Sequence, residues 1–170
     1  NLKGNFDLYR TMMVRYKIAC LMFGSGNFEE SINYLNQIIN EPMSTSLRQD
    51  IQCFARILNV LAHFELGNDE LILSQIRSTY RFLLKLEDLR MVQKEMLTFL
   101  RKAVFIDRTN MAPHFVELKE RLQIVADDKY EQRPFLYLDI ISWLESKIEG
   151  KKIEAIIREK NERMFGRFNN

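Results

Sequence analysis

The stretch MFGSGNFEESINYLNQIINEP, residues 22–42, decides the fold class of this chain. Its glycines, Gly24 and Gly26, interrupt a helical pattern, and a glycine just past a last helical turn can take the left-handed capping conformation. Glu29 and Glu30 then fall in a new first turn, where carboxylates suit the positive end of the helix dipole. The stretch therefore predicts a tight helix–turn–helix hairpin.

Apolar residues recur every three or four positions on both sides of this turn, which is the spacing of one helix face. Before the turn they are Leu8, Met12, Tyr16, Ala19 and Phe23, and after it they are Phe28, Ile32, Leu35, Ile38 and Ile39. Pro42 follows the second set, as is common just beyond a helix end. The first hairpin is expected over 8–42.

A second stretch, ELGNDELI, repeats this turn at residues 65–72. It separates two more helical patterns, which predict a second hairpin over 50–86 with Ser46 or Asp50 as its cap. Gly26 and Gly67 lie 41 positions apart. Helix pairs that recur at such a period are typical of an α-solenoid, in which each hairpin buries its face against the next.

The rest of the chain has helical periodicity with less regular punctuation, over 88–126 and 134–165. Thr109 or Asn110 is expected to cap a helix that has Pro113 in its first turn. Pro134 is expected to open another helix and Gly150 to end it. We therefore predict one all-α domain over 1–170, with about seven helices in stacked antiparallel hairpins. Because the first residue is not Met, the chain is expected to be part of a longer protein.

The composition agrees with this fold class. The chain is 46% hydrophobic and 28% charged, and its six Gly and three Pro are too few for the turns of an all-β fold. A net charge of +2 does not indicate nucleic-acid binding. The longest apolar runs fall short of the ~18 residues of a membrane span, so a cytoplasmic location is the default. Cys20 and Cys53 lie in apolar helical patterns and are expected to be buried, reduced thiols.

The first hairpin resembles a tetratricopeptide repeat (TPR), whose consensus is W-x2-L-G-x2-Y, then A-x3-F, then P. The turn SGNFEES is similar to the usual turn of that family. The consensus positions fall on Arg15, Ile18, Ala19, Met22, Ser31 and Leu35, with Pro42 one position early.

The second hairpin is a more divergent match, because its spacing exceeds the ~34 residues of the family. Its consensus positions fall on Arg56, Asn59, Val60, His63, Ile72 and Ile76. Residues 50–68 and 76–85 also resemble the C-terminal helical part of uncharacterised, mostly bacterial TPR proteins. The resemblance implies a TPR-like solenoid that binds other proteins, and it carries no enzymatic activity over to this chain.

No sequence motif for catalysis is present. The chain has no HExxH, P-loop, GxGxxG or CxxC pattern, and its only histidines are His63 and His114. We therefore predict no catalytic residue, no cofactor and no metal site.

Two polar rows at helical spacing form the first candidate site. One contains Gln52, Arg56, Asn59 and His63, and the other contains Arg77, Tyr80, Arg81 and Lys85. If the rows face each other, they form either a hydrogen-bonded network with acidic partners such as Glu65 or Asp50, or a basic pocket for a carboxylate, a phosphate or an acidic peptide.

The second candidate is an apolar groove along the first helix of each hairpin. Its residues are Met13, Tyr16, Cys20, Phe23, Phe54, Ile57, Leu61 and Phe64. TPR proteins that clamp a C-terminal carboxylate carry Lys and Asn at such positions, and this chain does not. Either the apolar helices of residues 88–170 cover this face, which is the favoured outcome, or a partner covers it.

The sequence thus favours a non-enzymatic helical scaffold that binds a protein, a peptide or another domain of its parent chain. The alternative is a module that senses a small anion or an acidic peptide through the polar rows. Nucleic-acid binding has weaker support, from the single short row Arg77, Arg81 and Lys85.

Overall fold

The computed structural model describes residues 2–42, 49–85, 91–103, 105–127 and 139–166, and every regular element in these ranges is a helix. This confirms the predicted all-α class. The elements, in chain order, are α1 (Leu2–Gly24), α2 (Phe28–Ile39), α3 (Gln49–Leu66), α4 (Asp69–Leu83), α5 (Met91–Ala103), the 3-10 turn η2 (Arg108–Asn110), α6 (Ala112–Ala126), α8 (Ile140–Glu149) and α9 (Ile153–Gly166).

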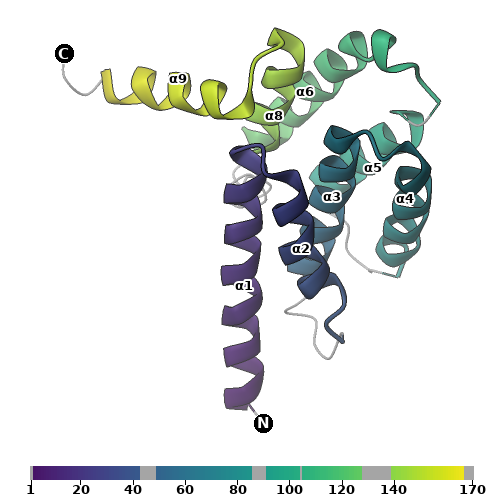
Figure 1. Cartoon of the computed structure of the whole chain (residues 1–170), viewed down its shortest axis with the longest axis vertical. Coiled ribbons are helices and arrows are strands. Elements are labelled where there is room, and N and C mark those ends of the chain that lie inside the picture. Colours follow the sequence, from purple (N-terminus) through teal and green to yellow (C-terminus); the bar gives the residue numbers. More distant parts are fainter. Residues whose placement is uncertain (1, 43–48, 86–90, 104, 128–138, 167–170) are drawn as a thin grey trace.

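The helices pack in the order in which they follow one another along the chain. Figure 1 shows α1 and α2 side by side, then α3, α4 and α5, and then α6, α8 and α9 across the top of the view, where Ile157 of α9 lies near Gly24 of α1. Helix α3 also contacts α1 and α5, whereas α4 lies close along α3 and touches α5 less extensively. The fold is therefore a stack of helical hairpins of the solenoid type, as the repeated turn predicts.

Both glycine turns predicted from the sequence are present. Gly26 has a φ of +82° and Gly67 a φ of +73°, which is the left-handed region. In the first turn the N–H of Asn27 donates to the carbonyl of Met22 at 2.8 Å, and in the second turn Asn68 donates to His63 at 3.1 Å. These bonds satisfy carbonyls at the ends of α1 and α3 and reverse the chain.

The helices of the first hairpin approach closely where their side chains are small. Ser31 of α2 is fully buried, and its hydroxyl donates to the carbonyl of Ala19 in α1 at 2.8 Å. Ala19 is also fully buried. A larger side chain at either position would push the two helices apart.

Several predicted helix ends are wrong. Thr109 and Asn110 do not cap α6, because they belong to η2, whose own cap is Asp107. Met111 precedes α6 instead, although Pro113 does lie in the first turn of that helix. Asp50 lies inside the first turn of α3 and not at its cap. The proposed cap Ser46 and the proposed helix start Pro134 lie outside the described residues.

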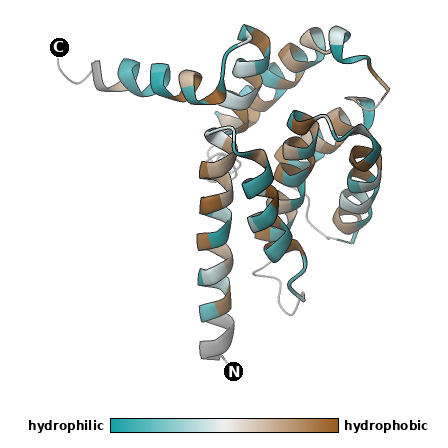
Figure 2. Cartoon of the chain, viewed as in Figure 1, coloured by the Kyte–Doolittle hydropathy of each residue, from teal (hydrophilic) through white to brown (hydrophobic). Residues whose placement is uncertain are grey.

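The predicted end of α8 is confirmed. Gly150 follows α8 with a φ of +65°. Figure 1 shows α9 extending away from the stack, and in Figure 2 most of this helix is coloured as hydrophilic. Its i,i+4 ion pairs have N–O distances of 2.7 Å (Arg158–Glu154) and 3.4 Å (Arg163–Glu159).

Helix α3 is the most deeply buried helix of the stack. Every residue from Ile51 to His63 is buried except Arg56, which is half-buried. A helix that is buried nearly all round needs neighbours that cover its apolar side chains and its polar ones alike. None of the helices in the described ranges combines the length and the apolar character needed to cross a membrane.

Replacing Gly26 by Ala tests whether the left-handed turn holds the first hairpin. An L-residue in this conformation costs about 1–2 kcal/mol, so Gly26→Ala is expected to lower the free energy of unfolding by that amount. Gly24→Ala is the control, because Gly24 is helical and a Cβ there would meet only Ile157 Cδ1 at 3.6 Å, an ordinary contact. If urea unfolding gave the same free energy of unfolding for both variants, that result would contradict the left-handed turn at Gly26.

Candidate functional site

The polar row of α3 lies against the end of α2. Gln52 is 1% exposed, and its Nε2 donates to the carbonyls of Ile38 at 3.1 Å and Glu41 at 2.8 Å. The last carbonyls of a helix have no partner within the helix. A side chain from α3 therefore satisfies carbonyls at the C-terminal end of α2.

Arg56 and Asn59 continue this contact between helices. Arg56 Nη2 donates to the carbonyl of Ile39 at 3.4 Å, and its guanidinium carbon lies 4.4 Å from the ring centroid of Phe82 on α4. Burial lowers the pKa of the Arg56 guanidinium. Asn59 Nδ2 donates to Oδ1 of Asn36 at 3.2 Å. Arg56 thus joins α2 to α4 across α3.

His63 completes the row at the turn between α3 and α4. Its Nδ1 lies 3.1 Å from Nδ2 of Asn68, the residue that precedes α4. Burial lowers the pKa of the His63 imidazole, which keeps the ring neutral and leaves Nδ1 as an acceptor for the Asn68 amide. The side chain therefore fixes the second hairpin turn.

One of the two acidic residues expected as partners of this row, Glu65, is not its partner. Asp50 Oδ1 accepts from the backbone N–H of Ile51 at 2.7 Å, and Glu65 contacts α8. Backbone carbonyls and amide side chains take the place of Glu65, because the row faces the end of α2. Three buried atoms of the row have no hydrogen-bond partner within the described protein, which limits what the network adds to stability: Gln52 Oε1, Arg56 Nε and Asn59 Oδ1.

The second polar row does not join the first. Arg77 and Arg81 are exposed, and Tyr80 is half-buried with its ring centroid 5.2 Å from the guanidinium carbon of Arg101 on α5. Within the described ranges, no hydrogen bond or ion pair links Arg56, Asn59 or His63 to this row. The two rows are separate features, one packed between helices and one on the surface.

The side chains expected to line an apolar groove lie inside the molecule. Tyr16, Phe23, Phe54, Ile57 and Leu61 are buried, and Phe64 is half-buried. The Phe64 ring packs edge-on against Phe115 of α6 and Trp143 of α8, with centroids 6.2 Å and 6.3 Å away. Helices from the second half of the chain therefore cover this end of the face.

The two cysteines form no disulfide, in line with the predicted reduced thiols, although only Cys53 is fully buried and Cys20 is half-buried. Burial raises the pKa of Cys20 to about 12 and raises the pKa of Cys53 as well. Both groups are protonated at neutral pH and are therefore poor nucleophiles. Within the part of the chain that the structure describes, no group of three or more His, Cys, Asp or Glu side chains could hold a metal ion.

A hollow of about 580 Å³ lies where the α1–α2 turn meets the α8–α9 turn, and four of its five charged side chains are engaged in ion pairs. Glu65 accepts from Trp143 Nε1 and from Lys147 Nζ, each at 2.6 Å. Lys151 Nζ lies 2.9 Å from a carboxylate oxygen of Glu159. The hollow therefore lies where α3 meets the hairpin of α8 and α9, and these polar groups stabilise that contact. Trp143 is 1% exposed and belongs to the core.

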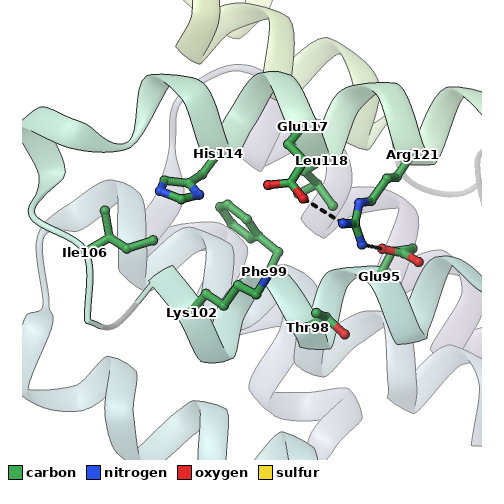
Figure 3. A pocket seen from close by; sticks show the side chains of 9 residues that line it. All are labelled: Glu95, Thr98, Phe99, Lys102, Ile106, His114, Glu117, Leu118 and Arg121. Carbon is green, nitrogen blue, oxygen red and sulfur yellow. Dashed lines mark hydrogen bonds and ion pairs between the residues drawn. The ribbon is translucent and has the colours of Figure 1, made fainter.

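A crevice between α5 and α6 is too small for a ligand (Figure 3). Its free volume is about 20 Å³, which is room for roughly one water molecule. Arg121 closes one side by pairing with Glu117 at 2.6 Å and Glu95 at 3.3 Å, and these carboxylates raise the pKa of its guanidinium. The crevice is a structural contact between two helices.

A larger hollow, here called the α4–α5 groove, opens between α3, α4 and α5 and has a volume of about 440 Å³. Its lining is apolar except at one end. The lining residues are Val60, Phe64, Ile72, Leu73, Ile76, Leu100, Ala103, Ile106, Asp107 and Arg108.

Each end of the α4–α5 groove carries charge. At one end Arg108 Nη2 donates to the carbonyl of Phe64 at 3.1 Å. At the other end Tyr80 lies one helical turn beyond Ile76, under Arg101. Sequence reasoning missed this groove, because residues 88–126 have no repeat signature that would show which part of α5 lies beside α4.

Comparison of the chain with models of protein families, with curated proteins and with solved structures finds no match to any of them.

Replacing Gln52 by Leu tests the link between α3 and the end of α2. Leu keeps the volume and removes both donated hydrogen bonds, so the carbonyl of Glu41 loses its side-chain partner, and a loss of about 1–3 kcal/mol is expected. Gln37→Leu, at an exposed position of α2, should stay within about 0.5 kcal/mol of the unmodified chain. Urea midpoints that shift equally in both variants would show that the buried bonds contribute nothing.

Proposed function

We propose that this chain is a non-enzymatic helical scaffold of the TPR type, which binds a segment of another protein or of its parent chain. The observation that carries the proposal is the α4–α5 groove, an apolar hollow at the seam between two helical hairpins. Clefts of ~300–1,000 Å³ with mainly apolar linings are the usual form of binding sites, and this groove lies within that range.

The turn chemistry of the first hairpin supports the TPR-like assignment. Ser31 stands at the small-residue position of the consensus, and its buried contact with Ala19 gives that position its physical reason, the close approach of two helices. The resemblance to mostly bacterial TPR proteins supports a bacterial origin. The free thiols Cys20 and Cys53 support a reducing compartment such as the cytoplasm.

A binding role is favoured over catalysis because several ionisable groups near the hollows have structural partners. Glu65, Lys147 and Arg121 are held in ion pairs, and the pKa of the Cys20 thiol is shifted away from the range of a nucleophile.

The alternative function is the sensing of a small anion or an acidic peptide, and fewer of the predicted residues are available for it. Arg56, Asn59 and His63 contact α2 or the α3–α4 turn. Only the exposed row around Arg77 and Arg81 is open to a ligand. The alternative therefore moves from the α3–α4 interface to the surface of α4.

Selection from a library of random peptides of about 15 residues, displayed on phage, tests the scaffold function. The immobilised chain is expected to enrich related sequences, and the synthetic peptides should bind saturably and more tightly than about 1 mM by fluorescence anisotropy. The same selection on a surface without the chain is the control. A selection that enriches nothing beyond that control would contradict the proposed function.

A further inference from the structure

We propose that the occupant of the α4–α5 groove is an acidic amphipathic helix. Its apolar side chains enter the hollow, and its carboxylates meet Arg77, Arg81 and Arg101. The inference rests on the scaffold function proposed above, and it adds the chemistry of the partner and the place where the partner binds.

The floor of the groove demands apolar side chains. Ile72, Ile76 and Leu100 supply its buried walls, and Leu73 at its mouth is 39% exposed. Phe105, beside the lining residue Ile106, is 88% exposed. Apolar side chains that gather around a hollow and stay open to solvent mark an interaction site.

A helical occupant satisfies its own backbone in such a place. The N–H and C=O groups of an extended peptide need partners, which a sheet edge would supply, and the described ranges contain only helices. A helix makes these bonds internally and can lay one apolar face in the seam between α4 and α5. From Ile72 to Arg81 the seam follows nine residue steps of α4, about 14 Å at ~1.5 Å per residue.

The arginines beside the groove differ from other arginines of the chain. Arg15, Arg121, Arg158 and Arg163 each have a carboxylate within ion-pair distance. In the described part of the chain, no ion pair involves Arg77, Arg81 or Arg101, which lie outside the lining itself, and Arg81 Nε donates to the carbonyl of Arg77 at 3.4 Å. Arg77 and Arg81 moreover stand at i and i+4, where like charges repel.

Carboxylates from a partner would remove that repulsion. Arg101 already stacks on Tyr80, which points a third cation at the same end of the groove. The guanidinium group is suited to carboxylates because it can donate two parallel hydrogen bonds.

The other end of the groove sets the direction of the occupant. Asp107 lines it, and its carboxylate accepts from the backbone N–H and hydroxyl of Thr109 at 3.0 Å and 2.9 Å. Arg108 lines the same end, so the two formal charges offset each other and this end offers no excess of cations to a carboxylate. The acidic end of the occupant therefore lies over the C-terminal half of α4, and its uncharged apolar end lies toward Asp107.

The test uses the full chain and three synthetic helical peptides of about 14 residues, followed by fluorescence anisotropy. The first peptide has leucines on one face and glutamates beside them, the second has lysine in place of glutamate, and the third has serine in place of leucine. The first is expected to bind saturably, and the other two at least tenfold more weakly. Added salt should weaken the binding of the first peptide.

Two matched double variants locate the contact. The R77E/R81E variant should bind the acidic peptide at least tenfold more weakly than the unmodified chain does, and it should bind the lysine peptide more tightly. K17E/K152E changes the net charge by the same amount at exposed lysines of other segments, and it should change binding less than twofold. Leu73→Asp, at the mouth of the groove, should also abolish binding, while circular dichroism shows an unchanged fold.

The outcomes separate this inference from the scaffold function. Equal binding to R77E/R81E and K17E/K152E, or tighter binding of the lysine peptide to the unmodified chain, would overturn the inference. Undiminished binding of the serine peptide, displaced by inorganic phosphate, would overturn it in favour of a small-anion site. If phage selection still enriches peptides in these cases, the scaffold function stands, and if it enriches none, both proposals fail.

Discussion

The rest of this structure depends on one constraint, which is the burial of α3 on nearly all sides. A helix in that position must have its apolar side chains covered by several neighbours, and its polar side chains must find partners inside the protein. Gln52 finds carbonyls at the end of α2, and Arg56 and Asn59 find partners on the same helix. The polar row of α3 therefore fixes how α2 ends against it, and a ligand is not needed to explain the row.

The C-terminal end of α3 connects the two halves of the stack. Phe64 packs on rings of α6 and α8, and Glu65 accepts hydrogen bonds from Trp143 and Lys147. These contacts join residues that are 51 to 82 positions apart in the chain. Helix α4 packs closely along α3 and contacts α5 less extensively. The α4–α5 groove opens where α4 and α5 are less closely packed.

The sequence predicts the hairpins well and their neighbours poorly. Gly26 and Gly67 mark the turns because a left-handed backbone favours glycine, which is a local effect. The partner of a polar row is not local, and the spacing of Arg56 and His63 says nothing about which helix they face. Arg101 was missed for the same reason, since only the packing of α5 on α4 brings it over Tyr80.

Unfolding observed through the single tryptophan tests directly whether α3 makes one cooperative unit of the stack. Trp143 sits where α3, α6 and α8 meet, so its fluorescence reports on that junction, while far-UV circular dichroism reports on all helices. The account predicts that both signals change at the same urea concentration. Loss of the tryptophan signal at a lower concentration, with most of the helical signal retained, would show that the last hairpin unfolds independently of α3.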